Sequence, residues 1–125
     1  MYKALIDRES LVSSKILNDY EIIDIYEEYW QGEVPEILHI SKVRVPEEKV
    51  DSFVKTLSSQ ELQDGWFALV WDEYKAIVIF KDKIFKLKNK NPWGKEELTE
   101  VIEYGRAHEI DEKYFLNMRS VMDIW

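Results

Sequence analysis

The stretch "WFALVWDEYKAIVIFKDKIFKLK", residues 66–88, decides the fold of this chain. It holds three apolar runs separated by short polar turns, and each run has the length of a β-strand. The middle run, 76–80, is apolar at every position, as expected of a strand covered on both faces. The last run alternates apolar residues with Lys86 and Lys88, which is typical of a strand at a sheet edge. The stretch therefore predicts three neighbouring strands.

Two further strands are predicted upstream. Apolar and polar residues alternate over 37–45, with a slip near Ser41. The run over 20–30 fits both the spacing of a helix and the alternation of a strand. We expect a strand there, because a turn over 32–35 would join it to the next strand as a hairpin.

Helical patterns are interspersed with these strands. After Pro46, apolar residues recur at the i, i+3, i+4 and i+7 spacing of an amphipathic helix. Another helix is expected to begin at Asn91-Pro92, where a capping residue precedes a proline suited to the first turn. A short helix capped by Ser10 and a C-terminal amphipathic helix over 112–125 complete the pattern.

This order of elements predicts a single α+β domain over residues 1–125. We expect an antiparallel sheet with helices on one face, a ferredoxin-like split β-α-β arrangement and the extra C-terminal helix. The chain has 125 residues, 46% of them hydrophobic, which is enough to bury a core without metals or disulfides.

Several kinds of chemistry are excluded by composition. The chain has no cysteine, which rules out disulfides, thiolate metal sites and cysteine nucleophiles. Its four glycines are too scattered for a phosphate-binding loop or a dinucleotide fingerprint. Neither His39 nor His108 has the partner spacing of a helical metal motif, so we expect no metal and no cofactor. The start of the chain lacks the apolar core of a signal peptide, which favours a cytoplasmic protein with no membrane association.

Charge is distributed unevenly along a chain whose formal net charge is -8. One acidic segment contains no basic residue; its members are Asp19, Glu21, Asp24, Glu27, Glu28, Glu33 and Glu36. A positive band interrupted only by Asp82 follows later; its members are Lys81, Lys83, Lys86, Lys88, Lys90 and Lys95. Lysines beside strand aromatics suggest single-stranded nucleic acid as a partner, but the acidic balance makes protection of a sheet edge the better interpretation.

The stretch "EYGRAHEIDEKYF", 103–115, is the best candidate for a ligand site. Its polar groups suggest the wall of an anion-binding pocket between sheet and helix, where Arg106 would bind an anionic group and His108 would exchange a proton. The residues of this candidate site are Trp71, Asp72, Tyr104, Arg106 and His108. The simpler interpretation is a packed helix end, in which Gly105 allows close approach to the sheet.

Two other features need an interpretation. His39 and Ser41 share one face of a predicted strand, but no third group completes a nucleophilic site, so a half-buried strand histidine is expected. The C-terminal helix carries an apolar stripe that either packs on the core or forms an interface with a second copy. The stripe consists of Phe115, Met118, Met122 and Trp125.

The segments "GWFALVWDEYKAIVIFKDKIFKL" (65–87) and "EYGRAHEI" (103–110) resemble a family of small uncharacterised prokaryotic proteins. That family has a G-W-[FY] strand, a V-x-F-x-x-K-x-F hairpin and a Y-G-x-x-x-x-I helix end. The resemblance covers roughly 4–115 and implies a shared fold without an assigned function. The family usually has Gly and then Ile-Pro after this helix, whereas the sequence here is Glu-Ile-Asp at 109–111, which argues against a special turn.

The sequence thus leaves three functional hypotheses, none with an assigned catalytic residue. The first is a non-enzymatic cytoplasmic interaction domain that works as a homodimer through the C-terminal helix and the sheet. The second is a small-molecule-binding protein or enzyme with an anionic-ligand pocket. The third is a binder of single-stranded nucleic acid.

Overall fold

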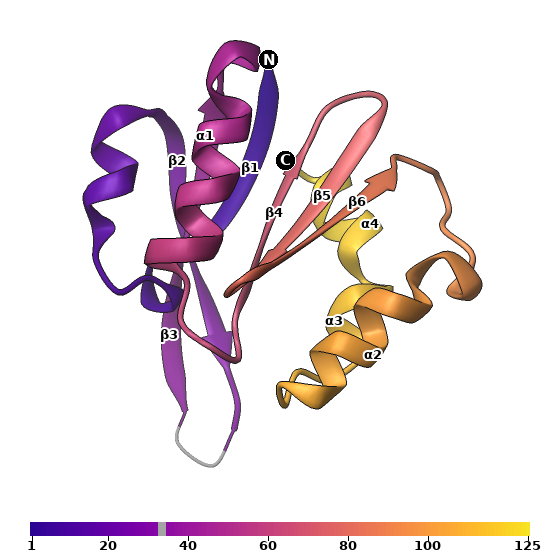
Figure 1. The fold of residues 1–125 in the computed structure, drawn as a ribbon. Coiled ribbons are helices and arrows are strands. Elements are labelled where there is room, and N and C mark those ends of the chain that lie inside the picture. The colour runs from indigo at the N-terminus through magenta and orange to yellow at the C-terminus, as the bar shows by residue number, and fades with distance from the viewer. Residues whose placement is uncertain (33–34) are drawn as a thin grey trace.

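The fold is built on one antiparallel sheet, shown in Figure 1 as a computed structural model that describes residues 1–32 and 35–125. Within these residues, six strands pair in the order β2-β3-β1-β4-β5-β6, and all neighbouring pairs are antiparallel. The strands are β1 (Tyr2–Asp7), β2 (Glu21–Trp30), β3 (Glu36–Val45), β4 (Phe67–Trp71), β5 (Lys75–Phe80) and β6 (Lys83–Lys88). The α+β class and the antiparallel sheet are confirmed.

Helical segments fill the connections and the C-terminal part of the chain. The α-helices are α1 (Val50–Thr56), α2 (Thr99–Ala107), α3 (Lys113–Leu116) and α4 (Met118–Asp123). Shorter 3-10 segments are η1 (Arg8–Ser10), η2 (Ser14–Asp19), η3 (Glu47–Lys49) and η5 (Lys95–Leu98), and η4 (Leu57–Glu61) is a π-helix that continues α1. The predicted turn over 32–35 includes Glu33 and Val34, which lie outside the described residues.

The central strand β1 was not indicated by the sequence pattern. It pairs with β3 on one side and β4 on the other, so that Ala4 lies opposite both Val43 and Val70. In the order β1, η2, β2, β3, α1, β4, the two helical connections each cross one strand: η2 joins β1 to β2 across β3, and α1 joins β3 to β4 across β1. This is the split β-α-β connectivity. The ferredoxin-like assignment itself stays a prediction, since β5 and β6 extend this core by two strands.

Helices cover both faces of the sheet, not one as predicted (Figure 1). On the face covered by α1 and η2, called here the α1 face, Ile79 shares a core cluster with Phe53 of α1. On the opposite face, called the α2 face, Val78 packs in a second cluster with Phe115 of α3. The correction follows from the alternation of a strand: β5 is apolar at every position from 76 to 80, so both of its sides need cover.

The C-terminal segment packs on the chain's own sheet. It forms two short helices, α3 and α4, which meet at Asn117 in place of the one predicted helix. Phe115, Met118 and Met122 are each less than 5% exposed within the α2-face core. Trp125 donates a hydrogen bond from its indole to the Ala4 carbonyl at 3.3 Å. The stripe on which the interface hypothesis rested is therefore core in this chain.

The end of α2 shows two departures from the sequence interpretation. Gly105 approaches the ring of Phe115 in α3, not the sheet, and a Cβ at this position would overlap that ring. A special turn is present after the helix, although the sequence argued against one. Glu109 has a φ of 66°, and the Ile110 amide donates to the Gly105 carbonyl at 2.8 Å. The turn is a left-handed helix cap in which Glu109 occupies the position that favours glycine.

The contact between Gly105 and Phe115 predicts that Gly105→Ala destabilises the protein by roughly 1 to 3 kcal/mol, because the added methyl group forces the buried ring to move. Urea unfolding followed by circular dichroism would measure this change. Gly94→Ala is the matched control and should change stability by about 0.5 kcal/mol or less, since its nearest atom is a Glu97 carboxylate oxygen at 3.6 Å. Equal stability of Gly105→Ala and the wild type would contradict the packing described.

Candidate functional site

The five residues of the predicted ligand site do not come together. Trp71 lies at the end of β4, where it is buried edge-on against Trp125. Asp72 follows it in the tight β4–β5 turn and accepts hydrogen bonds from the backbone amides of Tyr74 and Lys75. Tyr104 instead contacts Phe80, which is paired with the first residue of β4. The two groups of residues therefore lie at opposite ends of the β4–β5 pair.

The other three residues of that site, at the end of α2 and just after it, also separate into two surface arrangements. Tyr104 and His108 stack with ring centroids 4.3 Å apart, and His108 Nδ1 is 2.7 Å from an Asp64 carboxylate oxygen. Burial and nearby carboxylates raise the pKa of the Tyr104 hydroxyl. Arg106 points elsewhere, its side chain is 68% exposed, and it pairs with Glu112 at 3.4 Å. The simpler interpretation, a packed helix end with polar groups at its rim, describes this region better.

The nucleic-acid hypothesis needs accessible aromatics beside the lysines, and the structure covers them. Phe80 is 2% exposed, and both Phe67 and Phe85 pack in the α2-face core against α2 and α3. Bases stack on side chains that a sheet presents to solvent. The three lysines of the positive band on β6, Lys83, Lys86 and Lys88, thus stand at the edge of the sheet without any of these aromatics exposed beside them.

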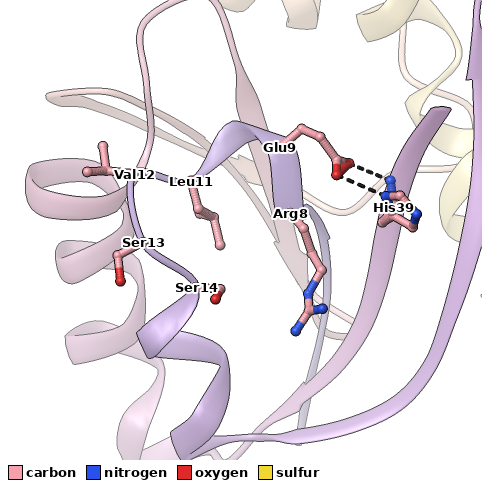
Figure 2. Close-up of a pocket in the computed structure, with 7 residues that line it drawn as sticks. All are labelled: Arg8, Glu9, Leu11, Val12, Ser13, Ser14 and His39. Carbon is pink, nitrogen blue, oxygen red and sulfur yellow. Dashed lines mark hydrogen bonds and ion pairs between the residues drawn. The ribbon is translucent and has the colours of Figure 1, made fainter. Parts of the chain in front are cut away.

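A hollow of about 440 Å³ lies between η1, the loop after it and β3, as Figure 2 shows. Its lining residues are Arg8, Glu9, Leu11, Val12, Ser13, Ser14 and His39. The carboxylate of Glu9 accepts from the backbone amide of His39 and lies 3.0 Å from His39 Nδ1. Burial opposes the ionisation of Glu9, but these hydrogen bonds from His39 outweigh it and lower the pKa of the carboxyl group.

The hollow is lined by two side chains of the kind that bind anions, Arg8 and His39, but its described residues do not form a nucleophile paired with a base. His39 is 43% exposed in its side chain, and its Nε2 lies 4.0 Å from Glu27. Ser41, the other member of the imagined pair, has a buried hydroxyl with no hydrogen-bond partner in the described residues. Arg8 extends away from the Glu9–His39 pair in Figure 2. Within residues 1–32 and 35–125, no three His, Asp or Glu side chains are grouped to hold a metal ion.

The pairing of β2 with β3 that the sequence predicted is present, and its far end forms an exposed ribbon, which the sequence did not indicate. β1 pairs with β3 only over 40–45, so 27–30 and 36–39 pair solely with each other within the described residues. This two-stranded ribbon projects beyond the rest of the sheet (Figure 1). Three of its apolar side chains are accessible: Tyr29 is 73%, Ile37 is 46% and Trp30 is 40% exposed.

The ribbon is nevertheless anchored at one side. Leu38 is buried in the α2-face core, and the Trp30 indole donates to the Tyr114 hydroxyl of α3 at 3.2 Å. Tyr29 and Ile37 face one another across the ribbon on the other side, where no helix covers them in the described part of the chain. The ribbon therefore holds an apolar surface in a fixed position.

A carboxyl group is buried where the ribbon leaves the sheet. Asp7 ends β1, and one of its oxygens is inaccessible and has no hydrogen-bond partner among the described residues. Burial, followed by repulsion from Glu28 and Glu9, raises the pKa of Asp7 from 3.8 to about 7. A buried carboxylate without a partner is costly, so the protonated form is the one that the fold favours.

This shift predicts a loss of stability as pH rises. Between about pH 4 and about pH 7 the folded state holds the Asp7 proton, whereas the unfolded state has released it. The free energy of unfolding therefore falls as pH rises through this window, by at most about 1.4 kcal/mol per pH unit. Asp7→Asn should abolish this fall and be more stable than the wild type at pH 8.

Urea unfolding of the wild type and of Asp7→Asn across this pH range would measure the difference between them. Asp19→Asn, which removes an exposed carboxylate, is the matched control. Parallel pH profiles for the wild type and Asp7→Asn would show that Asp7 is not protonated in the folded protein.

Comparison with known proteins adds no relative. The chain matches no family model, no curated protein and no solved structure. The resemblance to a family of small prokaryotic proteins therefore stays a prediction. No helix of the described residues is long and apolar enough to cross a membrane.

Proposed function

We propose that this protein is a non-enzymatic interaction domain whose binding surface is the free edge of β2 together with the β2–β3 ribbon. One observation carries the proposal: β2 is a ten-residue edge strand whose side chains at 23, 25, 29 and 30 are apolar and exposed. A strand at a sheet edge presents unpaired amide and carbonyl groups, which a second strand can bind.

The physical cost of leaving this surface free supports the proposal. A two-stranded ribbon is marginally stable in water by itself, and this one exposes Tyr29 and Ile37 on its open side. Exposed apolar groups that are gathered on one element mark interaction sites more often than apolar residues scattered singly. A partner that covered the ribbon would bury these groups and satisfy the edge at the same time.

The hollow in Figure 2 supports a second candidate function, the binding of a small anionic ligand. Arg8 is exposed and forms no ion pair within the described residues, and the Ser14 hydroxyl lines the same hollow. Glu9 stands beside them, which weakens the attraction for an anion. We rank this function below the interaction domain, and we place the protein in the cytoplasm, in keeping with its lack of cysteine.

Site-specific photocrosslinking in the native host cells would test the interaction surface. A benzophenone amino acid would replace Tyr29 on the ribbon and, as the matched control, Tyr74 in the β4–β5 turn; the two side chains are 73% and 76% exposed. The proposal predicts an adduct of one defined mass from position 29 and none from position 74. Absence of an adduct at position 29, or the same products at both positions, would refute it.

A further inference from the structure

The two free edges of the sheet carry opposite charge. β2 contains Glu21, Asp24, Glu27 and Glu28 and no Lys or Arg, and all four carboxylates are exposed. β6 contains Lys83, Lys86 and Lys88 and no acidic residue, and all three lysines are exposed. Four members of the acidic segment and three of the positive band thus lie on the two outermost strands of one sheet.

The sheet also has the geometry to continue from one molecule to the next. Because six strands alternate in direction, β2 and β6 run antiparallel to one another. A second copy shifted along the sheet would therefore present β2 to β6 as an antiparallel neighbour, with its α1 face on the same side. We propose that β6 of one molecule pairs with β2 of the next and joins copies of this chain edge to edge, an inference that rests on the proposed function of the β2 edge.

One register satisfies both charge and burial. When Glu27 lies opposite Lys86, antiparallel counting places Tyr29 opposite Ile84 and Tyr26 opposite Leu87. The faces agree as well. Ile84 packs in the α1-face core, so Lys86, two residues along β6, points to the same face. Glu27 points to this face as well, because it pairs with His39 of β3, and His39 lies on the same side of β3 as Val43 and Val45 of the α1-face core.

The side chains of the α2 face match in the same register. Tyr26 and Leu87 both pack at the margin of the α2-face core, so the pairing would extend this core from one molecule to the next. Opposite charges and apolar pairs that face each other across neighbouring strands stabilise a sheet. The register therefore combines an ion pair on one face with apolar pairs on both.

Charge disfavours the symmetric alternatives. Two β2 strands paired about a twofold axis would bring two acidic strands together, and two β6 strands would bring two lysine-rich strands together, so the charges repel in both cases. The contact between β6 and β2 is heterologous, so it does not close at two copies. Assembly should therefore grow with protein concentration and weaken as salt screens the charges.

Three charge variants of the full chain test the proposal by sedimentation velocity at low salt. The β6 variant, Lys83→Glu with Lys86→Glu, makes both edges acidic, and the β2 variant, Glu27→Lys with Glu28→Lys, makes the part of β2 that would pair with β6 basic, like β6 itself. Lys15→Glu with Lys55→Glu is the control, because it makes the same charge change as the β6 variant on exposed residues of η2 and α1.

The wild type and the control should exceed twice the monomer mass of 15.0 kDa as concentration rises, and added salt should return both to monomer. Each edge variant should stay monomeric alone, and an equimolar mixture of the two should regain the wild-type mass, which also shows that both variants are folded. Wild-type association that the β6 variant retains, or a mixture that stays monomeric, would overturn the proposal.

A wild type that remains monomeric at all concentrations would overturn it as well. The proposed function would still stand in that case if position 29 crosslinked to a protein of another mass. If position 29 yielded no adduct at all, the interaction surface itself would fail, so the two claims are tested separately.

Discussion

The burial of both faces of one antiparallel sheet is the constraint on which the rest of this structure depends. β5 is apolar at every position from 76 to 80, and its side chains alternate between two separate cores. Helix α1 with η2 completes one core, and α2, α3 and α4 complete the other. With both faces covered, the backbone amide and carbonyl groups of the sheet that lack a strand partner lie along its two edge strands, β2 and β6.

The C-terminal segment shows how tightly the second core is built. Phe115 fills the space that the missing side chain of Gly105 leaves free, and Trp125 reaches β1 through a hydrogen bond to Ala4. These contacts bury the apolar stripe of the C-terminal segment, which a second copy could otherwise have bound. An interaction domain can thus place its binding surface elsewhere, and in this chain the exposed apolar groups lie on the β2–β3 ribbon.

Local patterns in the sequence predicted the class of fold but not the long-range arrangement. The apolar runs within 66–88 and the alternating segment 37–45 form strands as predicted, because run length and alternation are local properties of the sequence. β1 escaped notice because its partners lie on β3 and β4, far along the chain, and its uninterrupted apolar run, 4–6, is shorter than the runs of β4 and β5. The unbroken apolar run of β5 already indicated that both faces of the sheet are covered. An amphipathic helix indicates only that its apolar side is buried, not which face of the sheet it packs on.

The candidate site was harder to predict for the same reason. Trp71 and Tyr104 were grouped by chemical type, but pairing of β4 with β5 places them at opposite ends of these strands. The exposure of Tyr29 depends on where β1 stops pairing with β3, which no pattern within β2 reveals. By contrast, the two charged segments were evident in the sequence, and only the strand order shows that their members on β2 and β6 occupy opposite edges.

Amide hydrogen exchange of the full chain, measured by mass spectrometry at low and high protein concentration, would test the central claim most directly. If the two edges bind one another, amides of β2 and β6 should exchange more slowly at high concentration, while those of α2 should be unchanged. Exchange at both edges that does not depend on concentration would contradict this account.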